Sequence, residues 1–411
     1  MSYLRPAVAL VLLSCFFTLT GTSAMQADDN VEQADVVVYG DASGGVTAAV
    51  QAARMGKSVI LVSQYGHLGG MTSSGLGWTD LGNPAILGGL SREFYHRLYK
   101  HYQNDAAWVH QQRDGYPNKG QGTPAFDHQT QLASVFEPKV AEAVFDALVD
   151  EAGVRVIPGR LDLKHGVTKR GARITAIKLE DGTTLKAKAF IDASYEGDLM
   201  AAAGVSFVVG RESNAEFNEQ HNGNTGVARK NQLRGGIDPY VVEGDPASGL
   251  LPSVNPDAGG ERGEGDHRLQ AYCYRMVLTD VAENRVMVRK PANYNEADYE
   301  ILFRAIEQGK RGGFFKTSPM PNRKTDSNNT GGISTDYIGM NYGDDWNWAT
   351  LSHAEREALA AKHRDWQLGL VWTLQNHPRV PEPIRNAYAK WGLAKDEFAD
   401  SGNWPYNIYS K

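Results

Sequence analysis

Cysteine is nearly missing from this chain of 411 residues, which contains only Cys15 and Cys273. Cys15 falls in an N-terminal stretch that we expect to be removed, so Cys273 would remain alone. A single cysteine excludes an intramolecular disulfide and a cysteine-ligated iron–sulfur cluster. The sequence also lacks a dense group of His, Cys and Asp residues at metal-ligand spacing, so no metal site is predicted.

Positive charge is not in excess either. The chain has 42 Lys and Arg against 48 Asp and Glu, a formal net charge of −6, and no basic clusters. Because proteins bind nucleic acids mainly by neutralising phosphates with Lys and Arg, we do not expect a nucleic acid partner. With 41% hydrophobic and 22% charged residues, the composition is that of a globular protein with room for two or three domains.

Long hydrophobic runs are absent as well. The apolar run at residues 7–17 follows Arg5 and precedes small residues that end at Ala24. It is too short for a comfortable membrane span, and the whole pattern is typical of a secretory signal peptide at residues 1–24. We therefore expect an exported protein, periplasmic or secreted, with no stable membrane span. Residues 12–15 faintly resemble a lipoprotein cleavage box, but the apolar run continues past Cys15, so no lipid anchor is expected.

Residues 35–62 have the pattern of a βαβ unit. An apolar strand at 35–39 is followed by a turn from Gly40 to Gly45, a helix that ends at Gly56, and a second strand at 57–62. Such a turn presents backbone N–H groups and the positive end of a helix dipole, which together bind a pyrophosphate. The unit therefore predicts a dinucleotide site.

The glycine pattern of this turn is incomplete. Ala42 replaces the central glycine of G-x-G-x-x-G, and Ser63 stands where an acidic side chain normally accepts the ribose hydroxyls. Ser63 or Gln64 would make that bond less strongly, and a plain βαβ turn without a ligand is the alternative. The cofactor contacts predicted here are Gly40, Ala42, Ser43, Gly44, Gly45, Ser63 and Gln64.

A second glycine-rich segment, residues 65–77, comes directly after the second strand. Its small side chains would let a flat ring system lie against the backbone. A flexible surface loop is the alternative, but the position in a nucleotide-binding fold favours a cofactor wall.

Three stretches, residues 36–61, 66–80 and 88–95, together resemble the FAD-dependent oxidoreductase family, whose exported bacterial members are often labelled xanthan-lyase-like. The resemblance implies FAD rather than NAD. It also implies an α/β fold, with a Rossmann-like FAD-binding domain of the glutathione-reductase type and a mixed α+β substrate domain. Within the glycine segment, the residues expected beside the isoalloxazine are Gly69, Gly70, Met71 and Thr72.

Further along the chain, Glu137 opens an amphipathic helix, and a strand at 154–157 follows. In similar flavoproteins that strand passes near the adenine, which assigns Val156 to the site. A hairpin with its turn at Asp181 and Gly182 then leads to a strand that runs to residue 192.

The segment after this strand resembles the strand end that closes many flavin domains. The positions carried over are Ala193, Ser194, Gly197 and Asp198. A strand running into an Asp-capped helix would explain the same residues without a cofactor.

These patterns divide the chain into an FAD-binding domain at 35–204 and a substrate or lid domain at 205–411. Residues 208–267 are rich in Gly, Asn, Glu, Pro and Asp, which predicts a loop over the site, with partial disorder as the alternative. Members of the family normally continue beyond the equivalent of residues 404–409. The resemblance therefore implies that the C-terminal segment returning to the flavin is missing here.

The second domain offers three further predictions. An alternating strand at 268–276 would place Tyr272 and Tyr274 on a ligand-binding face, or on an ordinary half-buried strand. Residues 321–332 are read as a polar loop that carries contacts. A capping box of Ser352 and Glu355 predicts a long helix that ends near residue 377.

Together these features predict an exported FAD-dependent oxidoreductase that takes hydride from a secondary alcohol, on a sugar or polysaccharide. The electrons would pass to an external acceptor that the sequence does not identify. Such chemistry needs a base near the hydroxyl, for which we select His267, with Tyr272 or Arg275 positioning the substrate. The alternative is a carbohydrate-binding or polysaccharide-lyase-like protein on a flavoprotein fold without redox turnover, which Ala42 and Ser63 motivate.

Overall fold

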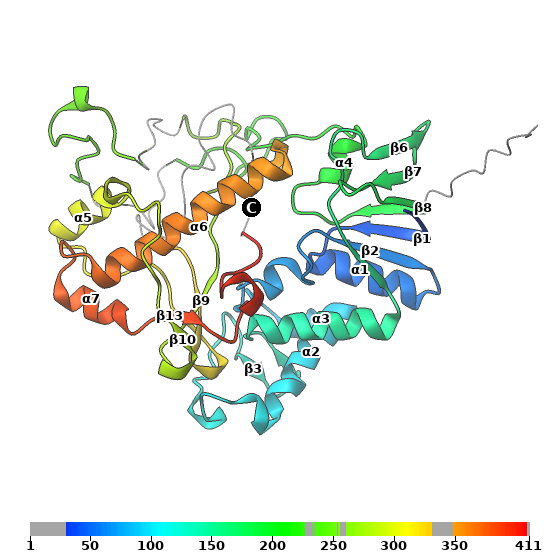
Figure 1. The fold of residues 1–411 in the computed structure, drawn as a ribbon, viewed down its shortest axis with the longest axis horizontal. Coiled ribbons are helices and arrows are strands. Elements are labelled where there is room, and N and C mark those ends of the chain that lie inside the picture. Colours follow the sequence, from blue (N-terminus) through cyan, green and yellow to red (C-terminus); the bar gives the residue numbers. More distant parts are fainter. Residues whose placement is uncertain are drawn as a thin grey trace, which may run out of the picture.

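Two sheets organise the computed structural model, one in each half of the molecule (Figure 1). The structure describes residues 30–226, 233, 235–252, 254, 260–330 and 348–408. The predicted signal peptide at 1–24 lies outside these residues. Within them, no helix is both long and apolar enough to cross a bilayer.

The first sheet contains the predicted βαβ unit, which is confirmed. Strand β1 (Val31–Tyr39), helix α1 (Ser43–Arg54) and strand β2 (Val59–Ser63) follow one another, and the two strands pair in parallel. Strands β5 (Arg155–Pro158) and β8 (Thr184–Asp192) extend the parallel sheet on either side. The order is β5-β2-β1-β8-β7-β6, with the last two strands antiparallel.

The predicted hairpin is also confirmed. Strand β7 (Arg173–Lys178) pairs antiparallel with β8, and β6 (Val167–Arg170) pairs with β7. A short helix, α4 (Asp198–Ala202), follows β8.

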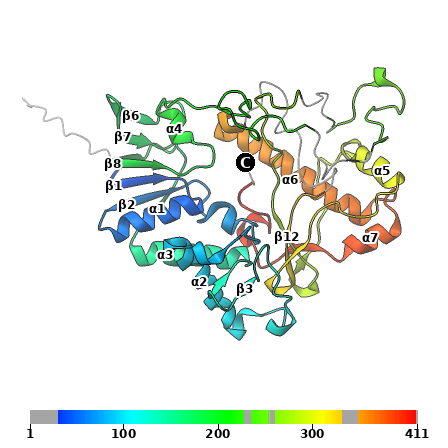
Figure 2. The same cartoon turned by 180° about the vertical axis from the view of Figure 1, so that it is seen from behind.

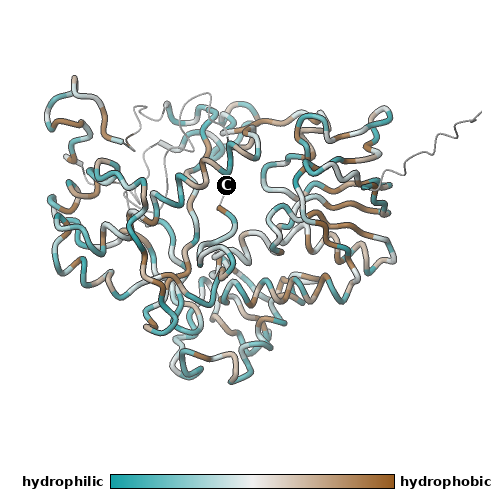
Figure 3. Tube along the Cα trace, viewed as in Figure 1, coloured by the Kyte–Doolittle hydropathy of each residue, from teal (hydrophilic) through white to brown (hydrophobic). Residues whose placement is uncertain are grey.

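Helices cover one face of the parallel sheet. Helices α1, α2 (Gly89–Gln103) and α3 (Pro138–Ala152) lie on the same side in both views (Figures 1 and 2). Because side chains alternate along a strand, Val38 of β1 packs in the core under these helices and Val37 packs in the core on the opposite face. Figure 3 shows this hydrophobic character concentrated along the strands of the sheet.

The second sheet has the order β10-β13-β9-β12-β11 and is antiparallel. Its strands are β10 (Arg285–Val286), β13 (Gly392–Ala394), β9 (Met276–Thr279), β12 (Lys324–Ser327) and β11 (Ser318–Met320). Helices α5 (Glu300–Glu307), α6 (His353–Asn376) and α7 (Glu382–Ala389) enclose a separate core with it. A small pair, β3 (Phe126–Asp127) and β4 (Leu132–Ala133), lies beside α2.

Helix α6 begins with the predicted capping box of Ser352 and Glu355, which is confirmed. It runs diagonally across the molecule from the neighbourhood of α4 to that of α7 (Figure 1). The α/β class with a mixed second half is therefore confirmed, whereas the proposed boundary at residue 204 stays a prediction.

Two predictions for the second half are wrong. Of the strand expected at 268–276, only Met276 belongs to a strand, and Tyr272 and Tyr274 are 3% and 7% exposed in the second core. Tyr272 packs against Trp348 and Tyr274 packs against Trp404, so both rings are buried, which the alternating sequence pattern did not predict. The expected polar loop at 321–332 contains the buried strand β12, and its last two residues lie outside the described part.

Candidate functional site

Four parallel strands end at one edge of the first sheet. Strands β1, β2, β5 and β8 run in the same direction, so the loops that follow Tyr39, Ser63, Pro158 and Asp192 lie along that edge. Ligands of open α/β sheets bind outside the carboxyl ends of the strands. Apart from Val156, which lies within β5, every predicted cofactor contact closes or follows one of these strand ends.

The turn after β1 has the shape that a pyrophosphate requires. Gly40 has φ +114°, and a Cβ there would lie 2.4 Å from the carbonyl carbon of Ala193. A Cβ at Gly45 would lie 2.1 Å from the Gly40 carbonyl oxygen, so both positions need glycine for close packing. Gly44 faces open space, and no side chain caps the first turn of α1. The first N–H groups of α1 therefore fit a phosphate-bearing cofactor.

Asp41, which was not among the predicted cofactor contacts, bonds to the end of β2. Asp41 is 3% exposed, and burial raises the pKa of its carboxyl. It accepts a hydrogen bond of 2.8 Å from the Ser63 hydroxyl and one of 3.2 Å from the Tyr65 backbone N–H. Ser63 is fully buried and thus bonded within the protein. Gln64 instead lines a small cavity of about 50 Å³ with Arg160.

The second glycine segment lies directly on the turn. Met71 donates its backbone N–H to the Tyr195 hydroxyl at 2.8 Å, and Ala42 forms a parallel bridge with Gly69. Gly69 and Gly70 both have positive φ, and a Cβ at Gly70 would lie 2.9 Å from the Ala42 Cα. The two glycine-rich loops therefore meet at the carboxyl edge of the sheet.

The same segment touches the second half of the molecule on its other side. A Cβ at Gly75 would lie 2.0 Å from the Arg275 carbonyl oxygen, and one at Gly77 would lie 2.0 Å from the Met320 sulfur. Asn407 also donates its backbone N–H to the Ser74 hydroxyl at 2.8 Å. The segment is thus a shared wall between the two halves.

The loop after β8 is bonded largely within the protein. Ser194 donates to Asp192 Oδ1 at 2.7 Å and accepts from the Asp198 backbone N–H at 3.0 Å. Asp198 is 3% exposed and accepts two hydrogen bonds from Arg356. These contacts match the alternative of a capped helix, although the side chains that accept from the helix start are Ser194, from the Asp198 N–H, and Asp192, from the Met200 N–H.

A polar cavity of about 260 Å³ lies between the glycine segment and the second sheet. Thr72 and Leu76 line it on one side, and Arg275, Asp326 and Asn328 line it on the other. Arg275 donates to both oxygens of Asp326 at 3.2 and 3.3 Å, and Asn328 donates to Asp326 Oδ1 at 3.0 Å. Complete burial raises the pKa of Asp326, against the opposing effect of Arg275.

One of the three catalytic residues predicted from the sequence lines this cavity. Arg275 lines it, whereas Tyr272 packs edge-on against Trp348 in the second core. His267 is exposed beside the Arg211–Asp266 ion pair and is not among the lining residues. Asp326 and Asn328 lie in the segment 321–332 that was predicted to carry contacts. Neither was selected individually, because a run of polar residues carries no hydrophobic pattern that would distinguish its members.

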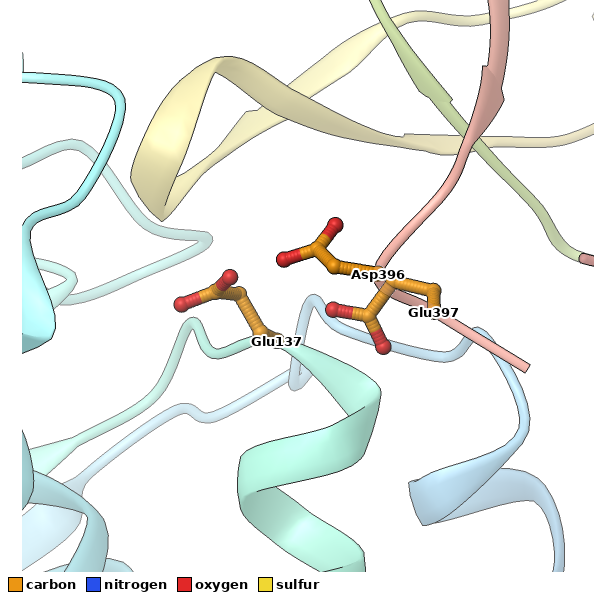
Figure 4. Close-up of side chains that lie close together, drawn as sticks. All are labelled: Glu137, Asp396 and Glu397. Atoms are coloured by element: carbon orange, nitrogen blue, oxygen red, sulfur yellow. The ribbon is translucent and has the colours of Figure 1, made fainter. Parts of the chain in front are cut away.

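A second polar cluster lies between α3 and the second sheet. Oxygens of Glu137, Asp396 and Glu397 lie within 4.8 Å of one another, and Figure 4 shows the three side chains close together. The Lys324 ammonium lies 2.7 Å from Glu137, 2.8 Å from Asp396 and 2.5 Å from Glu397. Lys324 therefore provides the positive charge that a bound cation would otherwise supply. Burial raises the pKa of Glu397 to about 7.

The parallel sheet, the uncapped glycine turn and the second glycine wall together define a dinucleotide-binding fold of the flavoprotein kind. The profile of one family, described as FAD dependent oxidoreductase, matches residues 35–410. The chain belongs to this family, whose cofactor is FAD and whose chemistry is oxidation and reduction. No curated protein sequence matches the chain.

Parts of the chain also match solved structures. One is 3-ketosteroid-Δ4-(5α)-dehydrogenase from Rhodococcus jostii RHA1, with 18% identity, a TM-score of 0.26, and coverage of 42% of this chain and 47% of that chain. L-amino acid deaminase from Proteus vulgaris has 18% identity, a TM-score of 0.29, and coverage of 44% and 51%. L-proline dehydrogenase from P. horikoshii has 15% identity, a TM-score of 0.29, and coverage of 44% and 59%. The chain therefore spans about half the length of these proteins.

Proposed function

We propose that this protein is an FAD-dependent oxidoreductase that takes hydride from a secondary alcohol, on a sugar or polysaccharide unit, and passes the electrons to an external acceptor. One observation carries the proposal. The polar cavity has Thr72 in its wall, and Thr72 belongs to the glycine segment expected beside the isoalloxazine. A substrate in this cavity would therefore lie next to the cofactor.

The chain's own residues divide the work of holding the cofactor. The turn from Gly40 to Gly45 would hold the pyrophosphate, and Gly69 to Thr72 would line the flavin ring. Bound FAD supplies the hydride acceptor for alcohol oxidation.

Alcohol oxidation also releases the hydroxyl proton, which a nearby base must accept. Asp326 is a buried carboxylate in the cavity wall, and burial increases its affinity for a proton. We therefore assign the role of base to Asp326 instead of His267, with Arg275 holding its position and its charge left uncompensated only while Asp326 holds the proton. Export remains part of the proposal and rests on the signal-peptide pattern at residues 1–24.

Flavin absorption tests this function. The purified chain, incubated with FAD and freed of excess cofactor, should show the visible spectrum of bound oxidised flavin. Anaerobic addition of a sugar or a sugar alcohol should bleach it. Asp326→Asn should slow this bleaching at least about 100-fold while flavin stays bound. A folded, colourless protein that binds glycans would contradict this function and favour the carbohydrate-binding alternative.

A further inference from the structure

The cavity between the glycine segment and β12 also contains information on the kind of molecule that it binds. Charged side chains at the cavity are balanced, since Arg275 and Lys316 are basic and Asp80 and Asp326 are acidic. Arg275 and Asp326 already satisfy each other, with side chains 14% and 1% exposed. The formal charges around the cavity therefore sum to zero, and its buried charged pair is already matched.

An ionic ligand would also break this buried pair. An anion bound to Arg275 would leave Asp326 without its partner, and a cation bound to Asp326 would do the same to Arg275. Removing one partner of a buried pair is strongly unfavourable because an uncompensated charge stays in the interior. A neutral ligand avoids this cost.

A neutral acceptor in the wall is still available. Asn328 is 4% exposed and uses its amide N–H₂ on Asp326. Its Oδ1 has no hydrogen-bond partner among the residues that the structure describes. A buried amide oxygen without a partner is unfavourable, and a ligand hydroxyl would satisfy it.

The rest of the wall suits the same chemistry. Thr72, Thr79 and Ser318 add hydroxyls that both donate and accept, and the rings of Trp78 and Tyr95 add flat apolar surface. At about 260 Å³, the cavity is slightly smaller than the roughly 300–1,000 Å³ typical of sites for drug-sized ligands. It has room for one small ring rather than for a chain of sugars.

We infer that this cavity binds a single neutral, hydroxyl-rich unit of monosaccharide size, and that Asn328 Oδ1 accepts one of its hydroxyl groups. The inference deepens the proposed function and rests on it for the redox role of the site. Asn328 is a substrate-binding residue in this scheme, and the buried Arg275–Asp326 pair sets specificity against charged sugars.

Matched ligands test the inference directly. Glucose, glucuronate and glucosamine share one ring and differ in a neutral, anionic or cationic substituent, and mannose and myo-inositol extend the neutral set. Each is titrated into the FAD-loaded and FAD-free full chain by calorimetry and by the fluorescence of Trp78 and its neighbours. At least one neutral probe should bind, and its charged counterparts should bind at least about tenfold more weakly.

Variants locate the binding. Asn328→Ala should weaken binding of the neutral probe about tenfold. Thr72→Val removes a wall hydroxyl with little change in side-chain volume, and it should also weaken binding of the neutral probe. It takes the place of Asn328→Ala in the test if that variant fails to fold. Asn295→Ala provides the same substitution as a control, because Asn295 caps a short turn before α5.

The outcomes separate this inference from the proposed function. Preferential binding of glucuronate or glucosamine, failure of every neutral probe to bind, or unchanged affinity in both wall variants would overturn it, even if flavin is bound and reduced. Neutral-sugar binding that Asn328→Ala weakens, in a protein whose flavin no alcohol reduces, would support the inference and contradict the proposed function.

Discussion

Arg356 of α6 donates two hydrogen bonds to Asp198 at the start of α4, at 2.8 and 2.9 Å. Both side chains are buried, and the pair joins the edge of the parallel sheet to the long helix of the other half. Trp348 adds a parallel link by donating its indole N–H to Glu196 at 2.7 Å. The two halves are thus held together by buried polar contacts beside the cofactor edge.

Replacing Arg356 with Gln should destabilise the protein by about 3–5 kcal/mol, because Asp198 would stay buried without its partner. Urea unfolding measures this loss. Arg54→Gln is the control, since the Arg54–Glu93 pair is partly exposed and exposed pairs contribute little. Equal stability losses in the two variants would contradict the role of the buried pair.

Two neighbouring glycines should respond differently to alanine. Gly45→Ala places a Cβ 2.1 Å from the Gly40 oxygen, so α1 must shift and both stability and FAD binding should fall. Gly44→Ala meets nothing within 4 Å, and alanine favours helix by up to about 1 kcal/mol. Gly44→Ala should keep the stability of the FAD-free protein but weaken FAD binding, because the added methyl group enters the open side where the pyrophosphate would lie.

Thermal unfolding and flavin-fluorescence titration of both variants check this pair. Undiminished FAD affinity in Gly44→Ala would place the pyrophosphate elsewhere. Wild-type stability in Gly45→Ala would show that the contact between α1 and the end of β1 is not tight.

Lys324→Met should cost about 3–5 kcal/mol near neutral pH, because it leaves three carboxylates together without their common partner. The loss should shrink at acidic pH, where protonation removes the repulsion. Unfolding free energies at pH 5 and pH 8 measure the difference. Lys188→Met, which removes an exposed lysine paired with Asp35, should show no such pH dependence of its effect.

Glu397 should make stability depend on pH. Its pKa is raised from 4.5 to about 7 by burial, against the attraction of Lys324 and with added repulsion from Glu137. Between these two values the native state retains a proton that the unfolded state has lost, so the stability from this group falls as pH rises from about 4.5 to about 7. The limiting slope is about 1.4 kcal/mol per pH unit.

Glu397→Gln removes the titrating group but keeps an oxygen for Lys324. The stability of this variant should therefore decrease less steeply than that of the wild type across this range. Chemical unfolding at several pH values gives both slopes. Identical slopes would mean that Glu397 is ionised throughout.

The local patterns of the nucleotide-binding half were readable from sequence because they depend on neighbours in the chain. The strand, turn and helix from residue 35 to 62 need only hydrophobic periodicity and the glycines at 40 and 45. The capping box of Ser352 and Glu355 is equally local. These elements form as expected.

The second half was harder to read because its features depend on distant partners. Lys324 and Glu397 are 73 positions apart and form a buried pair that no local pattern encodes. Tyr272 alternates with its neighbours, yet it is buried because Trp348 packs against it. Asp326 and Asn328 likewise line a cavity only because the fold places this part of the chain opposite the glycine segment.

Two glycines of this segment have no room for a larger side chain, since Gly70 lies against Ala42 and Gly75 lies against Arg275. Larger side chains there would push on the nucleotide fold and on the second sheet together. Evolution or engineering of a new substrate preference must therefore work through the opposite wall, on β11 and β12. Grafting that hairpin between relatives is the route by which such a scaffold would change its substrate while keeping its cofactor.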